Sequence, residues 1–352
     1  MECVVIGGGT MGRGIAQVLL AIPERPVVHV VEQDRHTASA AVDAVLAATD
    51  RERERRGDGP LGDDDRGRLL GADRVPEGAD PVLVIEAVPE DAALKADVLG
   101  RASRTWGRCL LASNTSSLSI TELAGSVEAP ERFLGMHFFN PVPRSALVEL
   151  VTHDRVDADT VAEARAWVER IGKESIEVRD APGFATSRLG LAIGLEAIRM
   201  VEEGVATAAD IDRGMVLGYR FPVGPLELTD RIGLDVRLAI AEHLADTLGD
   251  RFAPPGLLRD MVARGDLGQK TGGRASTTGA RGHDRCRVHQ PPDSTRALGG
   301  VDRARSTRQA ECAGRGDRRR VPPRARPAHR RACRGGDQFD DTRDLRVGCR
   351  SP

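Results

Sequence analysis

The sequence predicts an α/β protein: a doubly wound parallel sheet with helices on both faces, followed by a small all-α domain. Through residues 1–180, short apolar runs of strand length alternate with longer stretches of helical periodicity, as a parallel sheet with crossover helices requires. From residue 181 onward, apolar residues recur at three- and four-residue steps. We therefore expect one domain over residues 1–180 and a second, all-α domain over residues 181–272.

The first predicted strand ends in a glycine-rich turn. The run "CVVI" is followed by Gly7, Gly9 and Gly12 in the spacing G-x-G-x-x-G, and then by a helical pattern over residues 15–20. The first glycine permits a tight turn, the second lets the backbone approach a pyrophosphate, and the third lets the helix pack closely on the strand. Because the N–H groups at a helix N-terminus attract phosphate, this order of elements predicts a Rossmann-type dinucleotide site.

The second predicted strand lies in "PVVHVVEQD" and ends at Glu32. An acid at this position accepts hydrogen bonds from the adenosine ribose hydroxyls and repels a 2′-phosphate, which favours NAD over NADP as the cofactor. Arg35 is close enough in sequence to act as a rival cation. The alternative interpretation is a glycine turn and a surface acid with no cofactor.

Polar residues follow the ends of two further predicted strands, Pro81–Val88 and Arg108–Asn114. Glu90 and Lys95 follow the first strand, and the run "NTSS" at residues 114–117 closes the second. Ligands of a parallel, doubly wound sheet bind at the carboxyl ends of its strands. We therefore expect these residues beside the nicotinamide end of the dinucleotide.

His137, in the run "GMHFFNPVP", has two interpretations: a catalytic base or a histidine packed in the core. Glu149 lies in the apolar, strand-like run "SALVELV", where an acid is costly unless it is paired. A carboxylate on one ring nitrogen fixes the tautomer of an imidazole and stabilises its protonated form. Together with the glycine turn, this favours a base. No comparable acid or motif accompanies His29 or His153, so both are predicted to be structural.

Six motifs, in order along the chain, carry a family resemblance. They are "VIGGGTMGRGIAQ", "SNTSSLSI", "RFLGMHFFNPVP", "LVELV", "DAPGF" and "GPLELTDRIGLD". Together they resemble the NAD-dependent L-3-hydroxyacyl-CoA dehydrogenase family, of the short type that includes 3-hydroxybutyryl-CoA dehydrogenases. The similarity extends over residues 1–272, with a weak stretch from Arg51 to Arg74.

The resemblance implies roles for individual residues and NAD as the cofactor. His137 is the catalytic base, Glu149 is its carboxylate partner, and Ser116 forms a hydrogen bond at the substrate oxygen. Oxidising a secondary alcohol removes the hydroxyl proton as hydride leaves the carbon, and a neutral imidazole near pH 7 suits that task. The all-α domain is implied to cover the active-site cleft and to form a homodimer interface. Cofactor-side contacts are implied for Glu90, Lys95 and Asn140.

Two regions depart from the pattern of the family. Where the family usually carries Asn in a Pro-Gly-Phe-x-x-Asn-Arg motif, to contact substrate and histidine, this chain has Ser187. For the CoA moiety the family places Ser and Lys on the helix after the second strand. This chain offers Ala48 or Thr49 and, within "DRERERR", Arg55 as the nearest cation. That run is equally typical of a solvated helix face.

Composition limits the remaining possibilities. No window approaches the ~20 apolar residues of a membrane span, and no charged leader or cleavage site precedes the first strand, so a cytoplasmic protein is expected. The six cysteines have no metal-ligand spacing. Cys3 and Cys109 lie in apolar runs, which predicts buried free thiols rather than a disulfide.

The composition changes after Gly272. Residues 273–352 contain 20 Arg, no Lys and nine acidic residues, a net charge of +11 in a chain whose total is −2. One interpretation is a disordered basic arm that binds nucleic acid.

We favour a frameshift as the origin of this tail. The family commonly ends its helical domain with Lys-Thr-Gly-x-Gly-Phe-Tyr-Asp; residues 270–272 match its start, and a shifted reading of codons for residues 274–278 gives Gly-Phe-Tyr-Asp. The prediction is an Arg-rich, disordered tail.

Three functional classes follow. The first is an enzyme of fatty acid metabolism that oxidises a 3-hydroxyacyl-CoA thioester, or reduces the 3-keto compound, with NAD. The second is a related dehydrogenase whose acyl group is bound to an acyl carrier protein, as in polyketide extender-unit supply; the altered CoA-side residues motivate it. The third is a non-enzymatic NAD-binding or basic-tail interaction protein, against which Ser116, His137 and Glu149 argue.

Overall fold

The structure, a computed structural model, describes residues 1–271 apart from residues 75 and 77. The tail predicted for residues 273–352 lies outside these described residues. Among the helices that are described, none is both long enough and apolar enough to cross a membrane.

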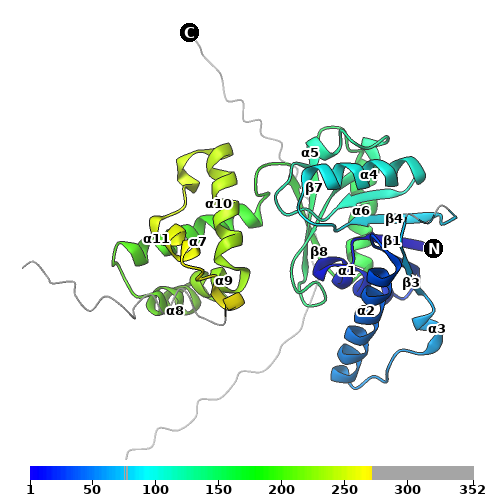
Figure 1. Cartoon of the computed structure of the whole chain (residues 1–352), viewed down its shortest axis with the longest axis horizontal. Helices are drawn as coiled ribbons and strands as arrows, with labels where there is room; N and C mark the ends of the chain where they lie inside the picture. The colour runs from blue at the N-terminus through cyan, green and yellow to red at the C-terminus, as the bar shows by residue number, and fades with distance from the viewer. Residues whose placement is uncertain (75, 77, 272–352) are drawn as a thin grey trace, which may run out of the picture. The chain divides into compact units, whose positions relative to one another are not determined.

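The first part of the chain forms an eight-stranded sheet with helices on both faces, as predicted (Figure 1). The strand order is β3-β2-β1-β4-β5-β6-β7-β8, and every neighbouring pair is parallel except β6 and β7. The strands are β1 (Glu2–Ile6), β2 (Val27–Val31), β3 (Leu69–Ala72), β4 (Pro81–Glu86), β5 (Leu110–Ser113), β6 (Phe133–Phe138), β7 (Leu147–Thr152) and β8 (Glu174–Arg179).

The antiparallel pairing of β6 with β7 is a departure from the predicted parallel sheet. A parallel neighbour needs a crossover of a dozen or more residues, usually a helix. The loop of residues 139–146 between these strands is too short for one and turns the chain straight back. This local exception decides the geometry of the candidate site.

Two apolar cores cover the two faces of the sheet, because successive side chains of a strand point to opposite sides. In β1, Cys3 and Val5 belong to one core, while Val4 and Ile6 belong to the other. The first core is completed by α1, α2 and α6, and the second by α4 and α5. These helices are α1 (Thr10–Leu20), α2 (Arg35–Arg56), α4 (Ala92–Thr105), α5 (Ile120–Leu123) and α6 (Ala158–Arg170), with a single turn, α3 (Asp63–Arg66).

The segment after β8 is helical and has a core of its own, built from residues such as Leu195, Leu226 and Leu244 (Figure 1). Its helices are α7 (Thr186–Glu202), α8 (Ala208–Tyr219), α9 (Pro225–Ile232), α10 (Leu234–Leu248) and α11 (Gly256–Ala263). Thr207 caps α8 by accepting a hydrogen bond from the backbone N–H of Asp210. The helical segment that the apolar periodicity predicts is therefore confirmed, and the cap fixes where one of its helices begins.

The two cysteines of the described chain are buried free thiols, as predicted. Cys3 lies in β1 and Cys109 directly precedes β5. Burial raises the pKa of each thiol to about 12. Since the thiolate is the reactive form, both side chains act as small apolar core residues at neutral pH.

Candidate active site

The glycine turn after β1 is shaped by close backbone contacts. Gly7 has a φ of +104°, and a Cβ there would lie 2.6 Å from the carbonyl oxygen of Ala87. A Cβ on Gly12 would lie 1.7 Å from the carbonyl oxygen of Gly7, so α1 packs on the turn only with glycine at this position. A Cβ on Gly9 would meet no atom within 4 Å. The open space beside Gly9, at the N-terminus of α1, suits a phosphate group.

Glu32 follows β2 and faces the same space. Its Oε1 accepts a hydrogen bond of 2.6 Å from the backbone N–H of Gly8, which fixes the carboxylate beside the turn. Glu32 lines a cavity of about 760 Å³ together with Gly7, Gly9 and Val88. The carboxylate, the open backbone and the cavity fit the adenosine half of a dinucleotide.

His137 and Glu149 are directly opposite each other in the antiparallel pair of β6 and β7. The ring Nδ1 of His137 lies 2.7 Å from Oε2 of Glu149, and both side chains are buried. Nδ1 is assigned as the protonated nitrogen because its neighbour is a carboxylate. Nε2 is then the nitrogen that can accept a proton. The rings of Phe139 and Phe184 flank the imidazole at centroid distances of 4.5 and 5.7 Å.

Residues at the start of α7 hold the other side of Glu149. The backbone N–H of Thr186 donates to Oε1 at 2.9 Å, its hydroxyl donates to Oε2 at 2.8 Å, and the N–H of Ala185 donates to Oε1 at 3.2 Å. Burial by itself raises the pKa of Glu149, but the bonds from His137 and Thr186 outweigh it and hold the pKa below its ordinary value. Glu149 is therefore a carboxylate at neutral pH.

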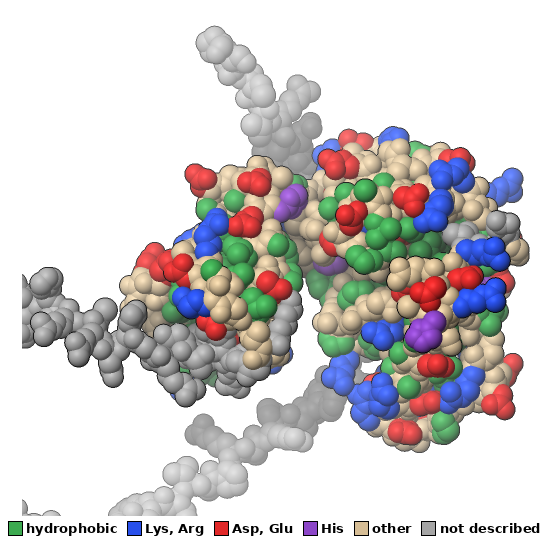
Figure 2. All heavy atoms as spheres, in the orientation of Figure 1, with side chains coloured by type: hydrophobic (Ala, Val, Ile, Leu, Met, Phe, Trp, Pro, Cys, Tyr) green, Lys and Arg blue, Asp and Glu red, His purple; other side chains and the backbone are tan. Residues whose placement is uncertain are grey.

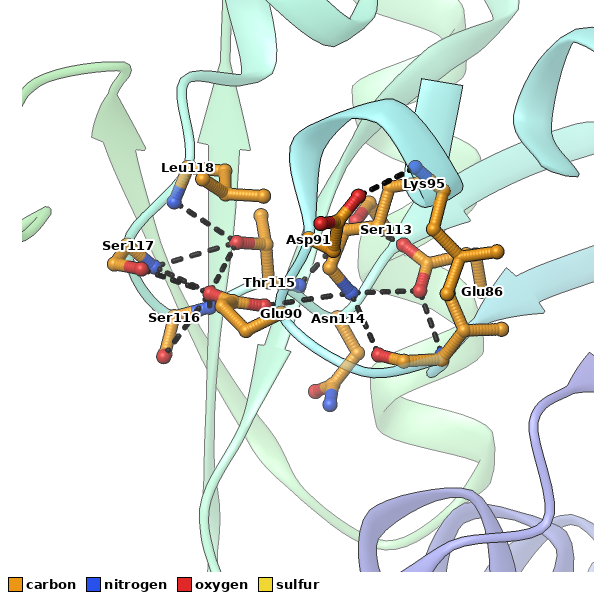
Figure 3. Close-up of polar contacts among 12 residues, drawn as sticks. Glu86, Glu90, Asp91, Lys95, Ser113, Asn114, Thr115, Ser116, Ser117 and Leu118 are labelled. Atoms are coloured by element: carbon orange, nitrogen blue, oxygen red, sulfur yellow. Dashed lines mark hydrogen bonds and ion pairs between the residues drawn. The ribbon is translucent and has the colours of Figure 1, made fainter. Parts of the chain in front are cut away.

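Glu90 organises the loop after β5 (Figure 3). Its Oε1 accepts hydrogen bonds from the hydroxyl of Thr115 at 2.7 Å, the N–H of Ser116 at 3.0 Å, and the N–H and hydroxyl of Ser117 at 3.1 and 2.9 Å. The hydroxyl of Ser116 is 3.3 Å away. Burial raises the pKa of Glu90, but Lys95 and these donors together lower it. An anion is thus the centre of the loop that carries Ser116.

Lys95 is buried beneath this loop and pairs with two acids (Figure 3). Its Nζ lies 2.7 Å from Oε1 of Glu86 and 3.4 Å from Oε2 of Glu90. Glu86 also accepts a bond of 2.6 Å from the hydroxyl of Ser113. The Lys95 side chain is 1% exposed and lies next to Glu90, and its role as a cofactor-side contact stays a prediction.

Sequence reasoning missed two residues of this region. Glu86, the last residue of β4, is the acid that neutralises Lys95. The sequence feature that could have revealed it is an acid at the end of an apolar strand. Asn114 was expected only as part of a polar run. Its Oδ1 accepts a bond of 2.9 Å from the N–H of Phe138, which ties the end of β5 to β6 next to His137.

The other residues predicted for the site lie at different places. Asn140 is exposed in the loop after β6, and Ser187 follows Thr186 in the first turn of α7. Arg55 is exposed on α2 and pairs with Glu52 at 2.8 Å. The structure thus groups His137 with Glu149, and Ser116 with Glu90 and Lys95, and it leaves Arg55 outside both groups.

A glycine turn at a helix N-terminus, an acid after the second strand and a buried His–Glu pair define the class of the protein. It is a dehydrogenase that uses NAD, built from a Rossmann-type sheet and a following helical region.

Comparison with known proteins identifies the family. A family profile described as "3-hydroxyacyl-CoA dehydrogenase, NAD binding domain" matches residues 2–181, and one described as "3-hydroxyacyl-CoA dehydrogenase, C-terminal domain" matches residues 183–277. A probable 3-hydroxybutyryl-CoA dehydrogenase of Deinococcus radiodurans is 40% identical over 276 residues, which cover 77% of this chain and 98% of that protein. The mitochondrial hydroxyacyl-coenzyme A dehydrogenase of Sus scrofa is 34% identical, with 76% and 88% of the two chains covered.

A solved structure supports the same family. The crystal structure of (S)-3-hydroxybutyryl-CoA dehydrogenase from Ralstonia eutropha matches with a TM-score of 0.72 and 37% identity, over 78% of this chain and 97% of that one. The chain belongs to the 3-hydroxyacyl-CoA dehydrogenase family. It is an NAD-dependent oxidoreductase that transfers hydride between NAD and the C3 position of a 3-hydroxyacyl-CoA thioester.

Proposed function

We propose that the chain acts on a short acyl group, of the 3-hydroxybutyryl and acetoacetyl type, with His137 as base and Glu149 as its partner. The buried contact of 2.7 Å between these two side chains is the observation that supports the assignment most directly. NAD, when bound, accepts the hydride that leaves C3 of the substrate. The relatives named for 3-hydroxybutyryl-CoA support the choice of acyl group.

In the oxidation direction, Nε2 of His137 takes the proton of the C3 hydroxyl. The imidazolium that forms lies against the Glu149 carboxylate, which stabilises the charge and keeps the ring in one orientation. The bonds from Thr186 hold that carboxylate ionised and in place. In the reverse direction, the same nitrogen returns the proton to the carbonyl oxygen.

Ser116 and Ser187 are proposed substrate contacts, on the loop held by Glu90 and on the first turn of α7. Glu90 is proposed to contact the nicotinamide half of the cofactor with Asn140, with Lys95 acting through Glu90. Glu32 and the glycine turn are proposed to hold the adenosine and pyrophosphate. Serine at position 187 is shorter than the usual Asn and needs a water to span the same gap. Ser187→Asn should therefore raise kcat/KM with acetoacetyl-CoA.

CoA is proposed as the carrier, with a carrier protein as the second candidate. A groove of about 790 Å³ lies between α1, α2 and the loop after β6. Figure 2 shows Lys and Arg side chains gathered over the C-terminal end of α2. Cations outnumber acids in its lining, which contains Arg25, Arg53, Arg56, Arg68, Arg144, Arg170 and Lys173 beside Glu52, Asp58 and Asp65. Such a surface suits the phosphates that distinguish CoA from a bare phosphopantetheine arm.

We also propose a domain organisation, an oligomeric state and a cellular location for this chain. Residues 1–180 form the NAD-binding domain and residues 181–272 a helical domain that joins two copies in a homodimer. Residues 273–352 are a frameshift product, which resequencing the gene around the Lys270 codon would test. The protein acts in the cytoplasm in fatty acid metabolism.

The decisive assay is NADH oxidation with acetoacetyl-CoA, compared with acetoacetyl-carrier protein at equal concentration. Activity with the CoA thioester is the expected result, and activity with the carrier-protein thioester alone would favour the second candidate. Arg53→Ala, in the groove, should raise the KM for acetoacetyl-CoA, whereas the matched variant Arg55→Ala, outside it, should not. No turnover with either thioester would contradict the proposed function.

A further inference from the structure

The cofactor cavity has a neighbour on the side of α2. A second cavity of about 460 Å³ is lined by Arg35, Ser39 and Val42 from α2 and by residues 71–74 at the end of β3. Asp73 and Arg74 line both this cavity and the one that contains Glu32. The space beyond Glu32 is therefore continuous with a region that holds two arginines.

Arg35 is held by Asp73 in this region. Nε of Arg35 donates a bond of 3.0 Å to Oδ2 of Asp73, at the C-terminal end of β3. This bond lowers the pKa of Asp73, which is therefore a carboxylate at neutral pH. The Arg35 side chain is 82% exposed, so packing does not fix it and the carboxylate is its described partner.

A 2′-phosphate would bring about two negative charges to this region. A Rossmann-type site accepts such a group when an arginine near the acid of the second strand is available to it. Here two arginines are present: Arg35, whose charge is matched by Asp73, and the exposed Arg74, which also lowers the pKa of Asp73. A phosphate in this cavity would meet two carboxylates, those of Glu32 and Asp73, which both line it.

We propose that Asp73 is a second specificity-determining residue, which sequesters Arg35 and so strengthens the preference for NAD over NADP set by Glu32. The two acids act in different ways. Glu32 repels the 2′-phosphate directly and binds the ribose, whereas Asp73 engages Arg35, a cation that would otherwise compensate for part of that repulsion. Loss of Asp73 should therefore improve NADPH use relative to NADH use.

The effect should be moderate, because Arg35 is exposed and Asp73 is partly exposed, and surface ion pairs contribute at most about 1 kcal/mol, or roughly five-fold in affinity. Asp73→Asn and Asp73→Ala should each raise kcat/KM for NADPH, relative to kcat/KM for NADH, by about two- to five-fold. The gain should shrink at high salt, which screens exposed charges.

The test is a double-mutant cycle over Asp73→Ala and Arg35→Ala, with NADPH binding measured directly by fluorescence titration as well as by turnover. If Asp73 acts through Arg35, the gain in NADPH affinity disappears in the double variant. Asp154→Asn is the control for the loss of an aspartate–arginine pair, because Asp154 pairs with Arg179 at 3.0 Å, the distance that also joins Asp73 and Arg35. A gain that survives in the double variant, or no gain in Asp73→Ala, would overturn the proposal. Both outcomes are independent of acyl-CoA activity.

Discussion

A buried cation occurs both in the sheet region and in the helical region, and the two have opposite surroundings. Lys95, in α4, lies among the carboxylates of Glu86 and Glu90 and donates to the backbone oxygen of Val88 at 3.0 Å. Arg237, in α10, is 5% exposed and occupies a core position of its helix. In the part of the chain that the structure describes, its Nε has no hydrogen-bond partner.

The surroundings of Arg237 are apolar or small. Its guanidinium carbon lies 4.0 Å from where a Cβ of Gly194 would be, and Leu234 and Ala241 are its neighbours on the buried face of α10. Burial lowers the pKa of Arg237 to about 10. The side chain therefore stays charged at neutral pH and carries an uncompensated desolvation cost.

The difference shows that burial of a charge is not by itself a sign of function. Lys95 belongs to a network in which each polar group has a partner, and that network ends on the loop carrying Ser116. Arg237 belongs to no such network among the described residues. What marks the site is the complete pairing of its buried charges, and this can be tested by removing charges from both regions.

The largest effect is expected from Lys95→Met. The variant leaves Glu86 as a buried, unpaired carboxylate, and removing one partner of a buried pair costs about 3–5 kcal/mol of unfolding free energy. Urea denaturation followed by circular dichroism measures it. The double variant Glu86→Leu/Lys95→Met should be more stable than Lys95→Met alone, since it removes the orphaned charge. Equal stability of wild type and Lys95→Met would show that the pair is dispensable.

The next effect concerns the reaction itself. His137→Gln should lower kcat by at least ~100-fold, the usual contribution of a positioned general base, with little change in NADH affinity. His153→Gln is the matched control, because His153 is also buried but its ring nitrogens contact the carbonyl oxygen of Phe133 and the N–H of Arg155. A kcat within a few-fold of wild type in His137→Gln would remove this histidine from the mechanism.

A smaller effect of opposite sign is expected from Arg237→Met. Methionine fills a similar volume without an unpaired donor, so the unfolding free energy should rise by about 1–3 kcal/mol, the cost of an unsatisfied buried group. Thermal and urea denaturation beside Lys95→Met give the comparison directly. A loss of stability in Arg237→Met would mean that the arginine has a stabilising partner, and the contrast between the two regions would fail.

The smallest effect is a pH dependence. The folded-state pKa of Glu149 is lowered, so its contribution to stability is fully present above the ordinary carboxyl pKa and is lost as pH falls through the lower, folded-state pKa. The stability difference between wild type and Glu149→Gln should therefore shrink as the pH drops below about 4. Urea denaturation of both proteins between pH 7 and pH 3 checks this. A constant difference over that range would contradict the lowered pKa.

Much of the fold was predictable because its signals are local. The glycine turn, the acid after β2 and the capped, periodic helices depend on residues close in sequence. Strand β3 (Leu69–Ala72) was missed because it is short and half of it is exposed. The sequence also did not indicate which side of α2 faces the groove. Arg53 and Arg56 line the groove and Arg55 does not, because packing against α1, rather than the local pattern, sets the orientation of the helix.

The sequence indicated which residue types belong to the site better than it indicated which side chains contact each other. His137 and Glu149 stood out because each is unusual in an apolar run. Glu86 did not, since an acid at a strand end is ordinary, and its importance arises only when α4 places Lys95 against it. Arg237 resembled any basic residue of an amphipathic helix until the partner helices fixed which face of α10 is buried.

The antiparallel pairing of β6 and β7 has a consequence for how the gene can change. Insertions in the loop of residues 139–146 leave His137 and Glu149 opposite each other, provided that the strands keep their pairing. A single-residue deletion inside either strand turns one of the two side chains to the other face of the sheet. Catalysis by this chain should therefore be especially sensitive to the loss of a single codon in either of these two strands.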